Sequence, residues 1–268
     1  MNESTARPSA RAAAPAIASE VHSNLASVAM SRVYFGHQSV GANILDGLRE
    51  LSSATLSAAL KIVGTRDVDS VAYPAVIEFP IGENGDPASK ASDFASALDK
   101  SSQRSPAIAL FKYCYLDVTP STDVTALFTA HRAGVRALQA RHPNIIFVHV
   151  TAPLTTVEPA PKVFLKRLLG KRTARDANQK RNEFNDRLRR EFEGEPIFDL
   201  ARVESTRPDG TRAFFVSGGN PIFTLAEELT DDGGHLNAMG RRAAAMELVA
   251  VLAELGAARA RAAPVRRS

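Results

Sequence analysis

Short apolar runs alternate with longer stretches of helical periodicity along most of this chain, and this alternation restricts the folds it can adopt. The apolar runs that we interpret as strands are Arg32–Phe35, Leu60–Val63, Ala75–Phe79, Ala107–Phe111, Ile145–Val150 and Ile197–Leu200. The segments with helical character are Val40–Leu51, Ser89–Leu98, Asp123–Ala140, Asp176–Phe192 and Asn237–Leu255. Because strands separated by helices form parallel sheets covered on both faces, the sequence predicts an α/β fold with a central, mostly parallel sheet.

The predicted elements form a single domain over residues 31–256, without an internal repeat or a composition change that would mark a boundary. Residues 1–30 are rich in Ala, Ser and Pro, and we expect a poorly ordered extension with one helical turn near Ile17–Val28. Residues 257–268 are expected to form a basic, disordered tail. The first thirty residues lack an apolar run behind a basic start, so we expect no secretory signal and a cytoplasmic location.

The length and the cysteine content exclude several classes of protein. A chain of 268 residues can bury a sufficient core without disulfides. Its one cysteine, Cys114, excludes an internal disulfide framework and a cysteine-based zinc cluster. No run approaches the roughly 18 apolar residues of a membrane span, and we expect no transmembrane segment.

The formal net charge of +4 and the pI near 9.4 could suggest a nucleic-acid partner. The last ten residues, however, hold four arginines and no acid, so the rest of the chain is neutral overall and we expect no such partner. Within the body, the segment Lys162–Arg190 holds eleven basic residues and three acids. This segment is either a solvated helix face or a surface for an anionic partner, such as a polysaccharide or a membrane.

Polar loops that follow the predicted strands are the places where chemistry is expected, because ligand sites of parallel sheets lie outside the carboxyl ends of the strands. The first loop, Phe35–Gly41, places Ser39 at the start of a helix, where backbone N–H groups can stabilise an oxyanion. Serine is also a frequent N-cap, so this residue alone leaves both interpretations open.

Two further loops carry candidate residues. In Thr230–Asn237, Asp232 and His235 are three residues apart, and the loop can fold the carboxylate onto one ring nitrogen of the histidine. In Phe79–Asp86, Gly82 and Asn84 can offer a backbone N–H or an amide to an oxyanion. Each loop is also typical of an ordinary turn, because Asp, Asn and Gly are turn formers.

Taken together, these loops resemble the Ser-Gly-Asn-His (SGNH) hydrolases, or GDSL-type esterases and lipases, in a divergent branch with a His-x-Ser-x-Gly nucleophile block. The resemblance covers about Arg32 to Leu255, and its most specific pieces are Asp232–Gly240, Val148–Pro153 and Ile197–Ala201. It implies a flavodoxin-like three-layer α/β/α sandwich without metal or organic cofactor. It also implies that Ser39 is the nucleophile, His235 the general base and Asp232 its orienting carboxylate.

The sequence departs from the family pattern at two places. The nucleophile block reads Gly-His-Gln-Ser where Gly-Asp-Ser is usual, and His37 either touches substrate or holds the loop. The third block reads Lys112-Tyr-Cys-Tyr-Leu-Asp and lacks the usual asparagine. Asn84 or Lys112 is therefore expected to replace the missing oxyanion donor.

The resemblance predicts a serine hydrolase that cleaves an acyl ester, often acetyl, from a carbohydrate or another small molecule through an acyl-enzyme. An O-acyltransferase acting on a sugar hydroxyl and a catalytically weak, SGNH-like binding protein are the alternatives. Cys114 as the nucleophile is less well supported, because a single cysteine at a strand end is usually a packed small side chain.

Overall fold

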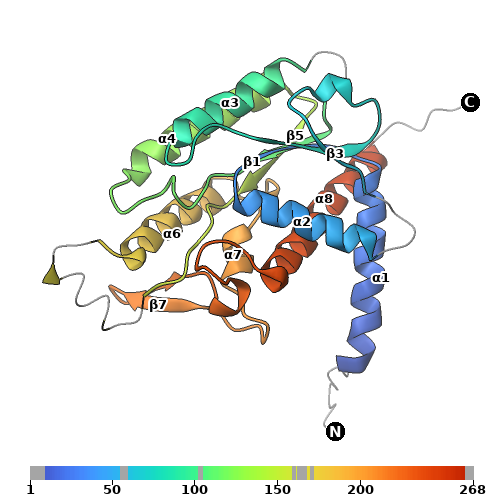
Figure 1. Cartoon of the computed structure of the whole chain (residues 1–268). Helices are drawn as coiled ribbons and strands as arrows, with labels where there is room; N and C mark the ends of the chain where they lie inside the picture. The colour runs from blue at the N-terminus through green and yellow to red at the C-terminus, as the bar shows by residue number, and fades with distance from the viewer. Residues whose placement is uncertain are drawn as a thin grey trace, which may run out of the picture.

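The computed structural model describes residues 10–54, 60–101, 105–158, 161, 168–169 and 172–262. Its centre is a six-stranded sheet in the order β2-β3-β1-β4-β5-β6, with every neighbouring pair parallel and helices on both faces (Figure 1). The expected three-layer α/β/α sandwich is confirmed. The strands are β1 (Arg32–His37), β2 (Ile62–Gly64), β3 (Ala75–Pro80), β4 (Ile108–Phe111), β5 (Ile146–Val150) and β6 (Ile197–Phe198).

The five helices that the periodicity predicted are present, and their ends lie within two residues of the predicted ones except at the end of the last helix. The helices are α1 (Ala10–Ala29), α2 (Val40–Ser53), α3 (Pro87–Asp99), α4 (Val124–Arg141), α6 (Ala174–Glu191), α7 (Leu200–Glu204) and α8 (Ala238–Ala262). Side-chain caps fix several starts: Asp86 accepts from Ser89 N–H, and Asp123 accepts from Ala126 N–H. The loops that these caps define bring the polar residues to the carboxyl edge of the sheet.

Alternate residues of β1 supply the two cores of the sandwich. Val33 and Phe35 are buried in the layer of α1, α2 and α8, and Tyr34 is buried in the opposite layer, which includes α3. On the first side α2 and α8 lie very close. The absence of a Cβ at Gly47 permits this approach, since a Cβ there would collide with the backbone oxygen of Arg241. This close approach fixes the start of α8 relative to the helix that begins after Ser39.

The amino-terminal region is more ordered than we expected. Within the region 1–30, expected to be a poorly ordered extension, residues 1–9 lie outside the described residues, and α1 runs over Ala10–Ala29 and packs along α8, with Leu25 and Val28 fully buried. Alanine has the highest helix propensity, and the two apolar side chains find a partner surface on α8 that is remote in sequence. At the other end, α8 extends past the predicted Leu255 to Ala262, and residues 263–268 of the expected tail lie outside the described residues.

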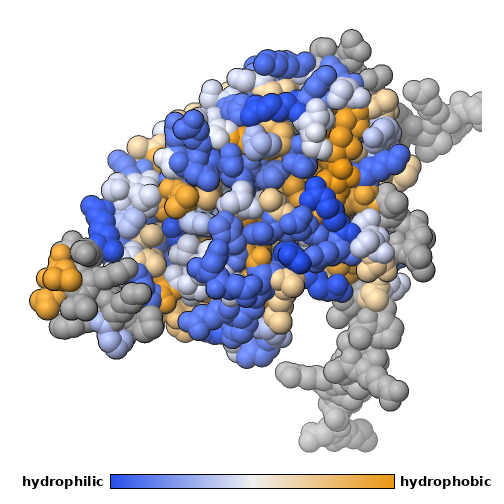
Figure 2. All heavy atoms as spheres, in the orientation of Figure 1, coloured by the Kyte–Doolittle hydropathy of each residue, from blue (hydrophilic) through white to orange (hydrophobic). Residues whose placement is uncertain are grey.

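A two-stranded antiparallel hairpin, β7 (Phe214–Ser217) and β8 (Asn220–Phe223), lies outside the main sheet and was not predicted. It packs on α6, where Asn182 exchanges hydrogen bonds with the backbone of Phe223. Phe214 and Val216 of this hairpin are exposed. The face of the molecule that Figure 2 shows is mostly hydrophilic. None of the helices in the described ranges combines the length and the apolarity of a membrane span.

Candidate active site

The carboxyl ends of β1, β3 and β4 lie side by side, since β1 pairs with both of the other strands. The loops that follow them, residues 38–39, 81–86 and 112–117, therefore meet at one edge of the sheet. The loop that carries Asp232 and His235 reaches the same edge, because it leads into α8, which packs against α2.

Ser39 has a strained backbone. Its φ of 29° and ψ of −88° make it the one non-glycine residue with positive φ in the part of the chain that the structure describes. Such a conformation costs about 1–3 kcal/mol and is typical of functional turns. Although Ser39 occupies the N-cap position of α2, its side chain makes no capping hydrogen bond, and Oγ lies 3.8 Å from Cys114 Sγ. The hydroxyl is thus not used for capping, which was the alternative explanation for a serine here.

Asp232 and His235 form the contact that their spacing predicted. His235 Nδ1 lies 2.6 Å from Asp232 Oδ2, and Asp232 Oδ1 accepts hydrogen bonds from the backbone N–H groups of His235 and Gly234. The His235 N–H, the His235 ring and the Gly234 N–H together hold the pKa of the Asp232 carboxyl well below its usual range. A permanently ionised carboxylate at Nδ1 favours the tautomer that leaves Nε2 free to accept a proton.

Side-chain and backbone contacts bring the His235 loop to the Ser39 loop. Asn43, one turn after Ser39, accepts a hydrogen bond from Leu236 N–H at 3.1 Å. Cys114 contacts Ser39, and the next residue, Tyr115, packs edge-on against the His235 ring with 5.7 Å between ring centroids. No hydrogen bond joins Ser39 and His235 among the described residues, and such contacts are often loose before substrate binds.

In the loop after β3, the two candidate residues differ in whether their donor groups are engaged. Gly82 N–H is donated to Asp93 and is therefore engaged within the protein. The Oδ1 atom of Asn84 accepts from Lys90 Nζ at 3.0 Å, which leaves its exposed amide NH₂ without a partner among the described residues. Of the two residues proposed from this loop, Asn84 is the one whose donor is available.

A buried ion pair that the sequence did not predict stabilises this loop. Lys90 and Asp117 are buried, with 2.6 Å between Nζ and Oδ2. Asp117 also accepts from the N–H groups of Gly85 and Cys114, so one carboxylate joins the loops after β3 and β4. Asp117 lies at the end of the altered third block, and its position after a buried strand was the only available signal.

His37 has a structural position. Its ring is buried, Nε2 lies 2.9 Å from Glu78 Oε2, and a Cβ at Gly41 would collide with it. Burial lowers the pKa of His37, and the contact with Glu78 opposes this effect. These contacts are typical of a side chain that holds the loop and not of one that touches substrate.

Lys112 is fully buried behind Ser39. Its Nζ donates to the carbonyl oxygens of Tyr113 at 3.0 Å and Gln38 at 3.3 Å. Burial lowers the pKa of Lys112 to about 8. The buried ammonium group therefore contacts the peptide that precedes Ser39.

The basic segment Lys162–Arg190 is only partly described, because Lys162, Lys166, Arg167 and Lys171 lie outside the described residues. Several described members are engaged within the protein. Arg181 is buried and donates to Tyr115 O, Arg189 pairs with Asp199, and Arg187 pairs with Glu183. These contacts leave the exposed charge of α6 smaller than the composition suggested.

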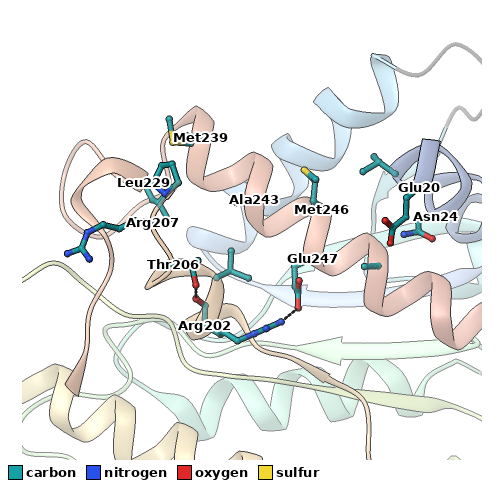
Figure 3. Close-up of a pocket in the computed structure, with 14 residues that line it drawn as sticks. Glu20, Asn24, Arg202, Thr206, Arg207, Leu229, Met239, Ala243, Met246 and Glu247 are labelled. Carbon is teal, nitrogen blue, oxygen red and sulfur yellow. Dashed lines mark hydrogen bonds and ion pairs between the residues drawn. The ribbon is translucent and has the colours of Figure 1, made fainter. Parts of the chain in front are cut away.

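A groove of about 490 Å³ lies between α1, α7 and α8, apart from the candidate active-site residues (Figure 3). Met239, Met246 and Val203 line it, together with Arg202 and Glu247, which form an ion pair at 2.7 Å. Neither Ser39 nor the Asp232–His235 pair lines this groove. Within the described residues, no three His, Cys, Asp or Glu side chains form a cluster that could hold a metal ion.

The chain is thus an α/β/α sandwich with a strained serine and an Asp–His pair at the carboxyl edge of a parallel sheet. No protein-family model matches it, and no curated protein matches its sequence. Several solved structures, including the following three, are similar over much of its length. A protein described as lipolytic and of the G-D-S-L family, from Desulfitobacterium hafniense, is 11% identical with a TM-score of 0.48 and covers 82% of this chain and 99% of its own.

The second structure is an acetyl xylan esterase, 16% identical with a TM-score of 0.45, covering 82% of this chain and 98% of its own. The third is a salicylyl-acyltransferase from a tetracycline biosynthetic pathway, 11% identical with a TM-score of 0.43. It covers 84% of this chain and 55% of its own.

Proposed function

We propose that the protein is a serine esterase of the SGNH type that removes a small acyl group from an alcohol. The observation that carries this proposal is the Asp232–His235 pair, held by the contact between Asn43 and Leu236 next to the loop of the strained Ser39. Nucleophilic acyl transfer requires a serine whose hydroxyl is available, beside a histidine oriented by a carboxylate. Ser39 meets the first condition because its hydroxyl makes no capping hydrogen bond.

In this mechanism the Ser39 hydroxyl turns from Cys114 towards His235, and Oγ attacks the ester carbonyl while Nε2 takes its proton. Asp232 stabilises the resulting imidazolium. The tetrahedral oxyanion accepts hydrogen bonds from Ser39 N–H and the free NH₂ of Asn84. The C–O bond then breaks, His235 protonates the leaving alcohol, and a water molecule attacks the acyl-enzyme by the same steps in reverse.

The exposure of the site supports a bulky alcohol component such as a carbohydrate. The His235 side chain is 40% exposed and that of Asp232 is 57% exposed, so one side of the catalytic pair is open to solvent. Cys114 is buried against the Ser39 hydroxyl and limits the space on the other side. A short acyl group, such as acetyl, suits this asymmetry.

Hydrolysis of p-nitrophenyl acetate tests the proposal. We expect Ser39→Ala to reduce hydrolysis to background, and His235→Ala and Asp232→Asn to reduce kcat by about 10³-fold or more. A fluorophosphonate probe should label wild type and not Ser39→Ala. Product analysis with an added polyol identifies transfer of the acyl group to an acceptor in place of hydrolysis.

The chain offers a matched control for the histidine variant. His142 forms a similar pair with Asp99, at 2.7 Å, after α4 and before β5, at the amino edge of the sheet. His142→Ala should leave kcat unchanged, whereas His235→Ala should not. Equal hydrolysis by Ser39→Ala and wild type would disprove the proposal.

A further inference from the structure

The peptide group between Gln38 and Ser39 is held from several directions. Its carbonyl oxygen accepts from Gly41 N–H at 2.8 Å and from Lys112 Nζ at 3.3 Å. The Gln38 side chain donates to the carbonyl oxygens of Ile81 and Gly82, each at 2.9 Å. The peptide group is therefore anchored to its own helix, to β4 and to the loop after β3.

The orientation of the carbonyl determines the orientation of the N–H of the same peptide. All described peptide bonds are trans, so the C=O of Gln38 and the N–H of Ser39 point in opposite directions. Holding the carbonyl towards the buried ammonium of Lys112 directs Ser39 N–H away from the interior. This is the N–H that the proposed mechanism assigns to the oxyanion.

We propose that Lys112 is a positioning residue that fixes the Gln38–Ser39 peptide so that Ser39 N–H faces the developing oxyanion. This inference rests on the serine-esterase function proposed above. Lys112 has no exposed surface, so it acts through the peptide and does not contact substrate. A cation that donates to the carbonyl also polarises the amide and strengthens its N–H as a donor.

The charge state of Lys112 links this role to pH. The ionisable groups that act on it are Cys114, Glu204 of α7, Lys90 of α3, Asp117 and His37 of β1. Burial lowers the pKa of Lys112 to about 8, the electrostatic influence of Cys114, Glu204 and Asp117 opposes this shift, and the charge of Lys90 adds to it. The ammonium is thus present below about pH 8 and is lost as the pH rises above that value.

The experiment compares wild type, Lys112→Met and Lys112→Gln in the pH dependence of kcat and KM. For Lys112→Met we expect a fall in kcat of about 10- to 100-fold with little change in KM. The hydrogen bond from Ser39 N–H to the oxyanion strengthens mainly in the transition state, so misplacing this N–H affects kcat more than KM. The decline of wild-type kcat above about pH 8 should be absent in this variant. Lys112→Gln keeps an N–H donor without charge, so it should recover part of kcat and show no such decline.

The controls separate this inference from the proposed function. Lys180→Met removes a partly exposed lysine of α6 and should leave kcat and its pH profile unchanged. If Ser39→Ala is as active as wild type, the esterase proposal fails and the Lys112 role fails with it. If Ser39→Ala is inactive but Lys112→Met keeps kcat and the decline above pH 8, only the Lys112 role is overturned. Should Lys112→Met not fold by circular dichroism, Lys112→Gln and the wild-type profile decide, and a flat wild-type kcat from pH 7 to 9.5 overturns the inference.

Discussion

Asn43 accepts a hydrogen bond from the backbone N–H of Leu236, 193 residues later, and this contact joins the helix that follows Ser39 to the loop that carries His235. The same loop is tied on its other side, where Thr156 N–H donates to Gly233 O at 2.9 Å. The histidine is therefore positioned by two long-range hydrogen bonds to the backbone of its loop, one from the Asn43 side chain and one from the Thr156 backbone, in addition to its carboxylate.

Removal of the Asn43 side chain should misplace His235 without unfolding the protein. For Asn43→Ala we expect kcat to fall about tenfold and the free energy of unfolding to fall by about 1 kcal/mol, since one partly buried hydrogen bond is lost. Asn43→Asp keeps the accepting oxygen and should retain more of kcat than the alanine variant. Steady-state kinetics and urea denaturation measure both effects, and an unchanged kcat in Asn43→Ala would contradict this role.

The positive φ of Ser39 predicts different stabilities for two inactive variants. Glycine adopts this backbone conformation without strain, whereas alanine does not. Ser39→Gly should therefore be more stable than Ser39→Ala by about 1 kcal/mol or more. Both should fail to hydrolyse p-nitrophenyl acetate. Urea midpoints of the two variants test the difference, and equal midpoints would mean that the strain is absent in solution.

Cys114 should limit the space at the nucleophile without taking part in the chemistry. Its Sγ lies 3.8 Å from Ser39 Oγ, and the side chain is buried. Cys114→Ala should keep kcat within about threefold, whereas Cys114→Leu should abolish activity by overfilling the site. Inactivity of Cys114→Ala, with normal circular dichroism, would favour the thiol as the nucleophile.

His131 should make the protein sensitive to acid. It is buried among aromatic rings, and burial, followed by the charge of His149, lowers its pKa to about 3. Between the unfolded value near 6.5 and about 3, the unfolded state binds the proton more readily, so stability falls as the pH falls through this range. The slope is at most about 1.4 kcal/mol per pH unit. His131→Phe should reduce it, as measured by urea midpoints at pH 7, 5 and 4, and an equal slope would exclude His131 as the cause.

Glu204 should have the opposite effect at higher pH. Its carboxyl is fully buried, and burial raises its pKa to about 8, although Leu154 N–H, Lys112 and Arg181 oppose the shift. The folded state therefore keeps a proton that the unfolded state releases between about pH 4.5 and 8, so stability falls as the pH rises through this window. Glu204→Gln keeps an acceptor for Leu154 N–H and should be more stable than wild type at pH 8. Thermal denaturation at pH 5 and pH 8 measures this, and a wild type that is at least as stable as the variant at pH 8 would refute it.

The sequence predicted the sheet well because its central strands are buried on both faces and appear as continuous apolar runs. It predicted only one helical turn near Ile17–Val28 within α1, whose alanine-rich sequence resembles a tail until α8 is in place to cover Leu25 and Val28. It also missed the β7–β8 hairpin, whose short strands carry exposed apolar residues in place of a clear alternation. Long-range packing determines both elements, and no local pattern contains that information.

In the candidate site, too, local contacts were predictable from the sequence and long-range contacts were not. The contact between Asp232 and His235 was predictable because it is local, three residues apart in a glycine-bearing loop. The backbone strain of Ser39 and the ion pair between Lys90 and Asp117 depend on contacts between separate loops. Gly82 satisfied the local pattern of an oxyanion donor, yet its N–H is directed to Asp93, which lies on α3.

The contact between Asn43 and Leu236 also has a consequence for biosynthesis. The residues of the proposed catalytic machinery lie near both ends of the described chain, and all the strands of the parallel sheet except β1 lie between them in sequence. Closing so long a loop is entropically costly and slow. During synthesis, Ser39 is made long before His235, so the two loops can meet only when almost all of the described chain is present, and hydrolysis would report completion of the domain.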